Sequence, residues 1–501
     1  MGRLFRLLLP ALGLAVLVVG VVLGPANARS NAPHKASAST FQTAKPLQIP
    51  SLREMRPVAA ARHVQVRRGL DAPQLAPTSP FGSVFDAPTA NAPVSAARGD
   101  IPDPIVNFEG ISVLCGCYPP DTNGDIGPNH YMEWVNLHYA IYDRAGNVLV
   151  GPSPGNTIFT GHPVCGTTNN GDPIVLYDSY AGRWLASQFA FQNVSTGPYY
   201  QCIAISNSSD PTAGWCTYEF QVHTTKFNDY PKFGVWPSQN AYMLTAPQFL
   251  GGATFAGVGV WGFERDVMLS CGTARMVYQD LPSQSTRMLP GDADGPNAPP
   301  TGAPNPIASM KDGAVNGGVD RIEIFNATIN WATPSISVVP EGDLPTTAFD
   351  SVLNCTPTAR SCIPQPGTTV RIDALSNRLM HRLQYRNFGA HQSMVVTHTV
   401  DTDGTGMAGI RWYEFRKTSG NWTIFDQGVY APGDGVYRFM GSAAMDRDGN
   451  IAAGYSVSNG SSVFPGIRYA GRLASDPPGT FGQGEATLIN GTGSQTGTAS
   501  R

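Results

Sequence analysis

The chain repeats one short pattern, in which an apolar run ends at an Asp, turn-forming residues follow, and a second apolar run begins. An Asp side chain that opens a turn hydrogen-bonds the backbone two residues ahead, and Gly or Asn tolerates the positive φ of a tight hairpin. We therefore interpret each Asp as a hairpin residue rather than a catalytic acid. The four copies span residues 139–150, 169–189, 370–380 and 442–453, with the Asp at Asp143, Asp178, Asp373 and Asp446.

Repetition of one hairpin over several hundred residues is typical of a repeat architecture. A third-strand pattern also recurs, at residues 257–264, 320–325, 409–415 and 466–472. Six units are visible, each of roughly 45 to 60 residues with up to four strands, which is the size of a propeller blade. The sequence therefore predicts an all-β fold, a β-propeller over residues 105–501. Stacked β-sandwich domains are the alternative, but sandwiches do not repeat one sheet along the chain.

Four stretches resemble a widespread group of secreted bacterial β-propeller proteins, mostly of unassigned function. They are residues 119–131 (PPDTNGDIGPNHY), 171–178 (GDPIVLYD, followed by Arg183 and Trp184), 228–236 (NDYPKFGVW) and 382–388 (RLQYRNF). The resemblance implies a fold and a location, and no established activity. Chains of that group continue into one more blade that begins Trp-Gly-Asp-Tyr. The resemblance therefore implies seven blades in the full-length form and a C-terminally incomplete propeller here.

The N-terminus predicts export. Arg3 and Arg6 precede an apolar run over residues 7–23, and Ala26-Asn-Ala28 offers a small-residue cleavage site. This pattern is typical of a secretory signal peptide over residues 1–28, and a single membrane anchor is the alternative. No second apolar stretch is long enough to span a bilayer, so we expect a secreted protein without a membrane span after cleavage.

The segment that follows, residues 29–104, is rich in Ala and Pro and lacks the apolar periodicity of a folded domain. Over residues 29–99 it carries nine basic and three acidic residues, whereas residues 100–501 carry 22 basic and 33 acidic residues. We predict a disordered basic spacer, which could contact anionic envelope polymers. The acidic body argues against nucleic acid as a partner.

Eight Cys in an exported chain are expected to form disulfides rather than bind metal. Cys355 and Cys362 enclose a short loop, and Cys165 and Cys202 belong to neighbouring strands, so we predict these two pairs. The spacing of Cys115 and Cys117 is expected to be too short for an easy mutual disulfide. The partners of four Cys are left open: Cys115, Cys117, Cys216 and Cys271.

In a propeller, the innermost strand of each blade lines the centre, and the loop before that strand lies at one mouth. Polar residues occupy these loops, so we expect them to form a ligand site. The loop over residues 121–125 has the alternating oxygen ligands and Gly of a calcium loop but lacks the closing Glu, so calcium and plain turn chemistry are both considered. The candidates are Asp121, Asn123 and Asp125 for the metal, and Asp172, Asp229, Lys232 and Arg438 for a polar ligand.

A second group of candidates lies in the fifth unit, at Arg382, Tyr385 and Arg411. Convergence of Arg382, Arg411 and Arg438 could hold a carboxylate, as in sialidase-like propellers. The alternative is that these side chains face solvent or neighbouring blades. The Ser-x-Asp-x-Gly-x-Thr-Trp turn typical of sialidases is missing, and residues 418–423 match it poorly.

The sequence contains no Gly-x-Ser-x-Gly, His-Glu-x-x-His, phosphate-loop or dinucleotide motif. We therefore expect an extracellular module that binds glycan or another envelope or matrix polymer. The alternatives are a glycoside hydrolase or lyase with a central pocket of Arg and carboxylates, and a structural or adhesive surface protein. Aromatic residues such as Trp134 and Trp184 could stack on sugars or pack between blades. Calcium is the one cofactor predicted, and the oligomeric state is left open.

Overall fold

The computed structural model describes residues 39–55, 101–355 and 361–497. These residues all belong to one compact unit, Ala36–Arg501, and the predicted signal peptide lies outside them. The described residues are almost entirely strands, joined by short helical turns. Their helices are α1 (Arg265–Leu269), α2 (Gly313–Asn316) and the 3-10 turns η1 (Gly155–Phe159) and η2 (Pro237–Gln239). In this part of the chain, no helix has the length and apolar character that crossing a bilayer requires.

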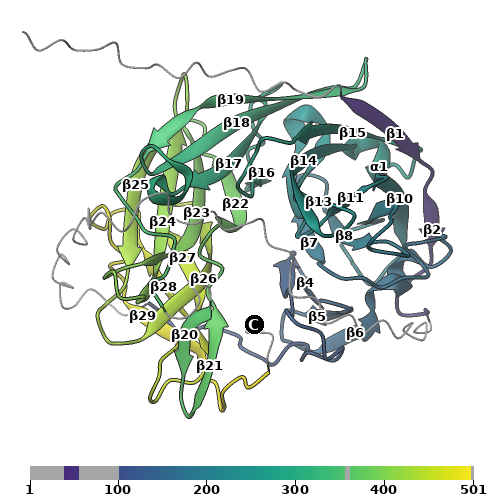
Figure 1. The fold of residues 1–501 in the computed structure, drawn as a ribbon. Helices are drawn as coiled ribbons and strands as arrows, with labels where there is room; N and C mark the ends of the chain where they lie inside the picture. The colour runs from purple at the N-terminus through teal and green to yellow at the C-terminus, as the bar shows by residue number, and fades with distance from the viewer. Residues whose placement is uncertain (1–38, 56–100, 356–360, 498–501) are drawn as a thin grey trace, which may run out of the picture. The chain divides into compact units, whose positions relative to one another are not determined.

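Six four-stranded antiparallel meanders follow one another along the chain (Figure 1). The first sheet contains β3 (Asn123–Ile126), β4 (His130–Val135), β5 (His138–Asp143) and β6 (Val148–Pro154). The second contains β7 (Ile174–Asp178), β8 (Arg183–Ala190), β9 (Tyr199–Ser206) and β10 (Trp215–His223). The third contains β12 (Lys232–Trp236), β13 (Ala241–Leu250), β14 (Thr254–Glu264) and β15 (Ala274–Leu281), and β11 (Lys226–Asn228) pairs with the end of β13.

The other three sheets repeat this order. The fourth contains β16 (Leu289–Asp294), β17 (Asn305–Lys311), β18 (Arg321–Asn330) and β19 (Ser335–Pro345). The fifth contains β22 (Met380–Asn387), β23 (Gln392–Asp401), β24 (Ala408–Lys417) and β25 (Thr423–Tyr430). The sixth contains β26 (Tyr437–Met445), β27 (Ile451–Ser458), β28 (Gly466–Arg472) and β29 (Glu485–Ile489).

The first strand of each sheet is its inner strand: β3, β7, β12, β16, β22 and β26. Each inner strand contacts the inner strand of the next sheet, and β16 and β22 pair in parallel. The sheets therefore follow one another around a common centre, as in a β-propeller. The predicted all-β propeller of six visible blades is confirmed, and a seventh blade stays a prediction.

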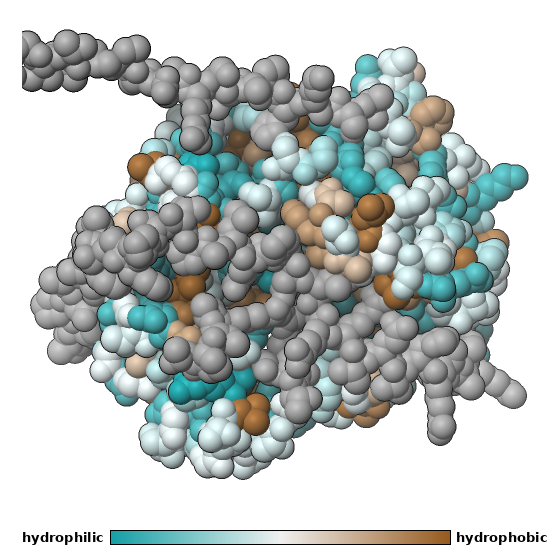
Figure 2. All heavy atoms as spheres, viewed as in Figure 1, coloured by the Kyte–Doolittle hydropathy of each residue, from teal (hydrophilic) through white to brown (hydrophobic). Residues whose placement is uncertain are grey.

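The core lies between neighbouring sheets. Because each sheet packs against another on both faces, several strands are buried almost throughout, and β13 is buried at nine successive positions. Five of the Trp side chains fill these interfaces, so these five are not free to stack on a sugar. Trp134, Trp184, Trp236, Trp261 and Trp412 are each at most 1% exposed. On the face shown in Figure 2, hydrophobic side chains occur in small groups separated by hydrophilic ones.

Three of the four predicted hairpins are confirmed: β5–β6, β7–β8 and β26–β27. The hairpin predicted over residues 370–380 is wrong. Asp373 does form the expected turn, because its Oδ1 accepts from Leu375 N at 2.9 Å. However, the chain then runs on into β22 of the fifth sheet instead of returning. Residues up to Asp373 belong to a separate hairpin of β20 (Ser361–Gln365) and β21 (Thr368–Asp373).

The predicted disordered spacer differs from the structure at its N-terminal end. Strand β1 (Thr40–Ala44) pairs with β15, and β2 (Leu47–Ile49) pairs with β10. The outer strands of the third and second sheets have unpaired backbone groups at their edges, which can order a segment that has little apolar pattern of its own. Ala44 and Ile49 are buried there, whereas Phe41 is 54% exposed.

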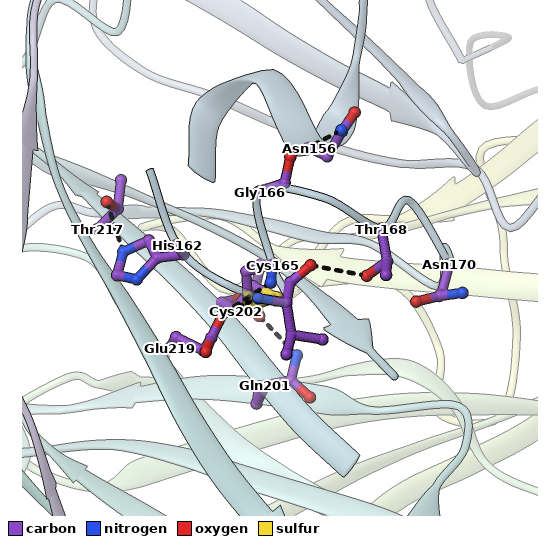
Figure 3. The surroundings of a disulfide bond; sticks show 12 residues. Asn156, His162, Cys165, Gly166, Thr168, Asn170, Gln201, Cys202, Thr217 and Glu219 are labelled. Carbon is purple, nitrogen blue, oxygen red and sulfur yellow. Dashed lines mark hydrogen bonds between the residues drawn. A yellow bond between two sulfur atoms is a disulfide. The ribbon is translucent and has the colours of Figure 1, made fainter. Parts of the chain in front are cut away.

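The structure contains both predicted disulfides and two further ones. Cys165–Cys202 joins the loop after η1 to β9, and Glu219 of β10 accepts from Val164 N and Cys165 N at 2.8 and 2.7 Å (Figure 3). Cys355–Cys362 is also confirmed. The expectation that Cys115 and Cys117 are too close to pair is wrong: they form a disulfide around Gly116, whose φ of +61° turns the chain. Cys216 pairs with Cys271.

Candidate functional site

The segments that lead into the inner strands share one backbone feature. Two residues before β3, β7 and β12 the chain adopts a left-handed conformation, with φ of 43° at Asp121, 50° at Asp172 and 49° at Tyr230. Non-glycine residues take this conformation at a cost of about 1–2 kcal/mol. The same conformation recurs at the same position of three successive sheets. Because the inner strands lie around one centre, the side chains of Asp121, Asp172 and Tyr230 lie in a shared central region.

The first part of this region is a pair of carboxyl groups. Asp121 and Asp172 are both partly exposed, and their carboxyl groups are hydrogen-bonded to each other. Burial raises the pKa of Asp121 well above its usual value, and the neighbouring Asp172 and Asp229 carboxylates raise it further against the effect of Lys232. The pair therefore favours a shared proton. Asn136 Nδ2 donates to Asp121 Oδ2 at 3.1 Å, and Tyr230 N donates to Asp172 Oδ2 at 3.2 Å.

The second part of the region is cationic. Lys232 Nζ lies 3.7 Å from the centre of the Tyr230 ring, and the Arg378 guanidinium lies 5.2 Å from the same ring. Arg287 and Arg378 are 6% and 4% exposed, with Asp229 as a nearby counter-charge. Burial and the adjacent Arg378 lower the pKa of Arg287 to about 9.

His381 lies beside these cations on the inner strand of the fifth sheet. Burial, together with the charges of Lys232 and Arg382, holds the pKa of His381 well below its usual value. Its imidazole is therefore neutral at physiological pH. The Nε2 atom of this ring is buried and has no hydrogen-bond partner among the described residues. We call Asp121, Asp172, Asp229, Lys232 and His381 the central cluster.

Arg382 lies next to the central cluster but is engaged by the fourth sheet. Its Nε lies 2.8 Å from Asp292 Oδ2, and its Nη2 lies 3.2 Å from Asp294 Oδ2. Burial would raise the pKa of Asp294, but Arg382 and hydrogen bonding from Gln384 outweigh burial and lower it. Asp292 Oδ1 also accepts from Val235 N at 2.9 Å. These ion pairs join the inner strands to one another and leave Arg382 little capacity for a ligand.

Four of the predicted site residues do come together: Asp121, Asp172, Asp229 and Lys232. Tyr385 does not join them, because its ring packs against Trp236 in the core and its hydroxyl donates to Gln392 Oε1 at 2.9 Å.

Arg411 and Arg438 are also held elsewhere. Arg411 Nη2 donates to Thr347 O and to Gln427 Oε1, at 2.9 and 2.8 Å. Arg438, only 1% exposed, pairs with Asp434 and Glu485 at 2.8 and 2.7 Å. Neither partner set overlaps with that of Arg382, so the predicted three-arginine pocket is not formed.

The two remaining metal candidates connect the first and second sheets. Asn123 Oδ1 accepts from Val175 N at 2.6 Å, and Asp125 Oδ2 accepts from Tyr177 N at 2.8 Å. Across the described ranges, no group of three or more His, Cys, Asp or Glu side chains is arranged to hold a metal ion. Calcium at residues 121–125 stays a prediction, and binding it would require these oxygens to exchange their backbone donors.

Four residues of this region were not among the predicted site residues: Tyr230, Arg287, Arg378 and His381, although His381 belongs to the charged group of the fifth unit. Three of them occupy the same repeat position as Asp121 and Asp172, two residues before an inner strand: Tyr230 before β12, Arg287 before β16 and Arg378 before β22. Applying that spacing to every unit would have found them. The unit boundaries in residues 285–380 are irregular, so the starts of β16 and β22 could not be located from the sequence.

Comparison with solved structures gives distant matches to β-propeller enzymes. An endo-arabinase from Bacteroides thetaiotaomicron is 12% identical, covers 62% of this chain and 95% of its own, and has a TM-score of 0.28. An exo-β-1,3-galactanase from Clostridium thermocellum is 10% identical, covers 72% of this chain and 76% of its own, with a TM-score of 0.31. A polysaccharide lyase, ulvan lyase, is 11% identical, covers 74% of this chain and 82% of its own, with a TM-score of 0.35.

No family model matches the sequence, and no curated protein matches it.

Proposed function

We propose that this chain is an exported saccharide-binding protein and that the central cluster is its binding site. The Asp121–Asp172 carboxyl pair carries the proposal. It is partly exposed, and it is assembled from the segments that lead into two different sheets. Carboxylates are strong acceptors for the hydroxyl groups of a sugar, and a pair of them can bind two adjacent hydroxyls at once. The four disulfides and the signal-peptide pattern support an extracellular location.

The test is a glycan array with the purified protein, followed by calorimetric titration of each hit. Replacing a carboxylate removes charge-assisted hydrogen bonds, so we expect Asp172→Asn to weaken binding about tenfold to a hundredfold. Asp448→Asn is the matched control, because that carboxylate is exposed on the turn between β26 and β27. The absence of any glycan hit would reject this function and would favour a structural surface protein.

A second candidate function is cleavage of a glycosidic bond. The observation that favours it is the raised pKa of Asp121 beside the Asp172 carboxylate. One protonated and one ionised carboxyl group is the division of roles that glycoside hydrolysis uses. The hydrogen bond holds Asp121 and Asp172 closer than the about 5 Å separation of retaining enzymes, so cleavage requires the pair to part when a sugar binds between them. Product formation from the array hits tests this proposal. Asp121→Asn should then abolish turnover while retaining measurable binding, whereas binding without turnover by the unmodified protein would leave binding as the function.

A further inference from the structure

Lys232 differs from the other cations around the centre. Arg382 is paired with Asp292 and Asp294, and Arg378 interacts with Tyr230, Asp373 and Asp229. Lys232 is partly exposed, and its ammonium group lies over the face of the Tyr230 ring, near enough to Asp121 for its charge to oppose the rise in the pKa of that carboxyl group. Among the described residues, no carboxylate oxygen lies within ion-pairing distance of its ammonium group. A ring face supplies much less stabilisation than a carboxylate does. Lys232 can therefore accept an anion from outside the chain.

His381 adds a neutral hydrogen-bonding group beside Lys232. It lies close to Lys232, and the buried Nε2 atom of its ring has no hydrogen-bond partner among the described residues. An imidazole nitrogen that carries a proton donates a hydrogen bond to an anionic oxygen. A ligand carboxylate between Lys232 and His381 would satisfy both groups, and it would also offset the positive charges of Lys232 and Arg382 that His381 faces.

The central cluster thus has two chemically different sides. The first and second sheets supply Asp121 and Asp172, which accept hydrogen bonds, and the third and fifth sheets supply the positive charge of Lys232 and the unpaired ring nitrogen of His381. A neutral sugar would engage the carboxyl pair and leave the cationic side without a partner. A ligand with several negative charges on one group, such as a phosphate, would offer more charge than one ammonium group neutralises.

We propose that the ligand of the central cluster is an acidic saccharide that contains a uronic acid, with its carboxylate on Lys232 and His381 and its hydroxyls on Asp121 and Asp172. This inference rests on the proposed saccharide-binding function and specifies its substrate class. It assigns Lys232 as the residue that discriminates a charged sugar from its neutral counterpart, because the other side of the cluster contacts groups that both sugars share.

The test compares each of three ligands in two forms. Oligogalacturonate, oligoglucuronate and oligomannuronate are titrated beside their carboxyl-reduced forms, which keep the hydroxyls and lose the charge. We expect at least one acid form to bind about tenfold to a hundredfold more tightly than its reduced form. Lys232→Met should bring the ratio of acid-form to reduced-form affinity down to about one. Lys45→Met is the control, because Lys45 is exposed between β1 and β2.

Methyl esters of the same oligosaccharides remove the charge without altering the protein, so the result does not depend on how well the Lys232 variant folds. Equal affinity of the unmodified protein for the acid, reduced and ester forms would overturn the uronate assignment and leave saccharide binding standing. Preserved discrimination in Lys232→Met would overturn the role of Lys232. Failure to bind any form of any saccharide would reject the proposed function itself.

Discussion

At the scale of single residues, the left-handed conformation is what places the carboxyl groups of the central cluster. Asp121, Asp172 and Tyr230 keep positive φ values although none of them is a glycine. Strained backbone of this kind concentrates at functional sites, where a side chain is needed at a position that glycine would occupy at lower cost. The carboxylate at Asp172 is thus retained against a conformational penalty.

This penalty can be measured at Asp172. Asp172→Gly and Asp172→Ala both remove the carboxylate and the hydrogen bond from Tyr230 N, but only alanine has to adopt the left-handed conformation. We expect the glycine variant to have a free energy of unfolding about 1 kcal/mol higher than the alanine variant. Chemical denaturation of the two proteins checks this. Equal stability would show that the backbone relaxes when the side chain is removed.

His398 predicts how stability depends on pH. It is fully buried, and its Nε2 lies 3.0 Å from the hydroxyl of Tyr413, which also accepts from Arg411 Nε at 2.7 Å. Burial, followed by the charge of Arg411, lowers the pKa of His398 from 6.5 to about 3. Because the folded state disfavours the protonated ring, its contribution to stability is complete above pH 6.5 and is lost as the pH falls toward 3.

The contribution of His398 is isolated by His398→Gln, which cannot titrate and can still hydrogen-bond the Tyr413 hydroxyl. The unmodified protein should lose up to about 1.4 kcal/mol more per pH unit than this variant between pH 6 and pH 4. Urea titrations at several pH values provide the comparison. Parallel pH profiles for the two proteins would exclude His398 as a source of the acid sensitivity.

At the scale of elements, β1 and β2 cross from the third sheet to the second along their outer strands. The Cys216–Cys271 disulfide connects the same two sheets, since Cys216 is in β10 and Cys271 follows α1. Gln48 of β2 contacts this disulfide, with Nε2 at 3.4 Å from Cys271 Sγ. The N-terminal segment and the disulfide therefore stabilise one joint between sheets.

Removing that disulfide should loosen the N-terminal strands first. We expect the double variant Cys216→Ser and Cys271→Ser to lose about 2–4 kcal/mol of stability, as is typical of a native disulfide. Hydrogen exchange should become faster across residues 40–49, with little change in β26–β29 of the sixth sheet. Unchanged exchange at residues 40–49 would show that β1 and β2 are held independently of the cross-link.

The elements also show which features a sequence can predict. The β5–β6 and β26–β27 hairpins were predictable because the Asp143 and Asp446 side chains hydrogen-bond backbone within the same turn. The Asp373 turn has the same local chemistry, but the path of the chain after it is decided by tertiary pairing. Pairing of β1 with β15 and of Cys216 with Cys271 is likewise non-local, so composition could not indicate it.

Part of the central cluster was predictable because the repeat places some of its residues, whereas tertiary contacts decide the position of others. Asp121, Asp172 and Asp229 could be placed because the repeat puts the start of every inner strand near one centre. The arginines Arg411 and Arg438 could not be excluded from sequence, since only the structure shows that partners on outer strands engage them.

At the scale of the whole folded unit, residues 101–111 connect the last sheet of the series to the first. Ile101 N donates to Gln483 O at 2.5 Å, and Asn107 Nδ2 donates to Leu488 O at 2.7 Å. On the first sheet, Ile111 N donates to Glu133 Oε2 at 2.8 Å, and the Phe108 ring lies 5.0 Å from that of Tyr142. This segment joins two sheets that lie far apart in the chain.

Weakening this connection should affect both sheets at once. We expect Asn107→Ala combined with Phe108→Ala to lower the free energy of unfolding by about 1–3 kcal/mol, since one hydrogen bond and one aromatic contact are lost. Hydrogen exchange should rise in β4–β5 and in β28–β29 and stay unchanged in β13–β14. A change confined to one of the two sheets would contradict a connecting role.

The pairing of the N-terminal strands also sets an order of assembly. A ribosome makes residues 40–49 long before it makes their partners, Trp215–Thr217 in β10 and Ala274–Tyr278 in β15. These strands can dock only after the second and third sheets exist, so residues 40–49 stay unpaired while the first three sheets are made. When β1 and β2 dock, the second and third sheets gain their last strands.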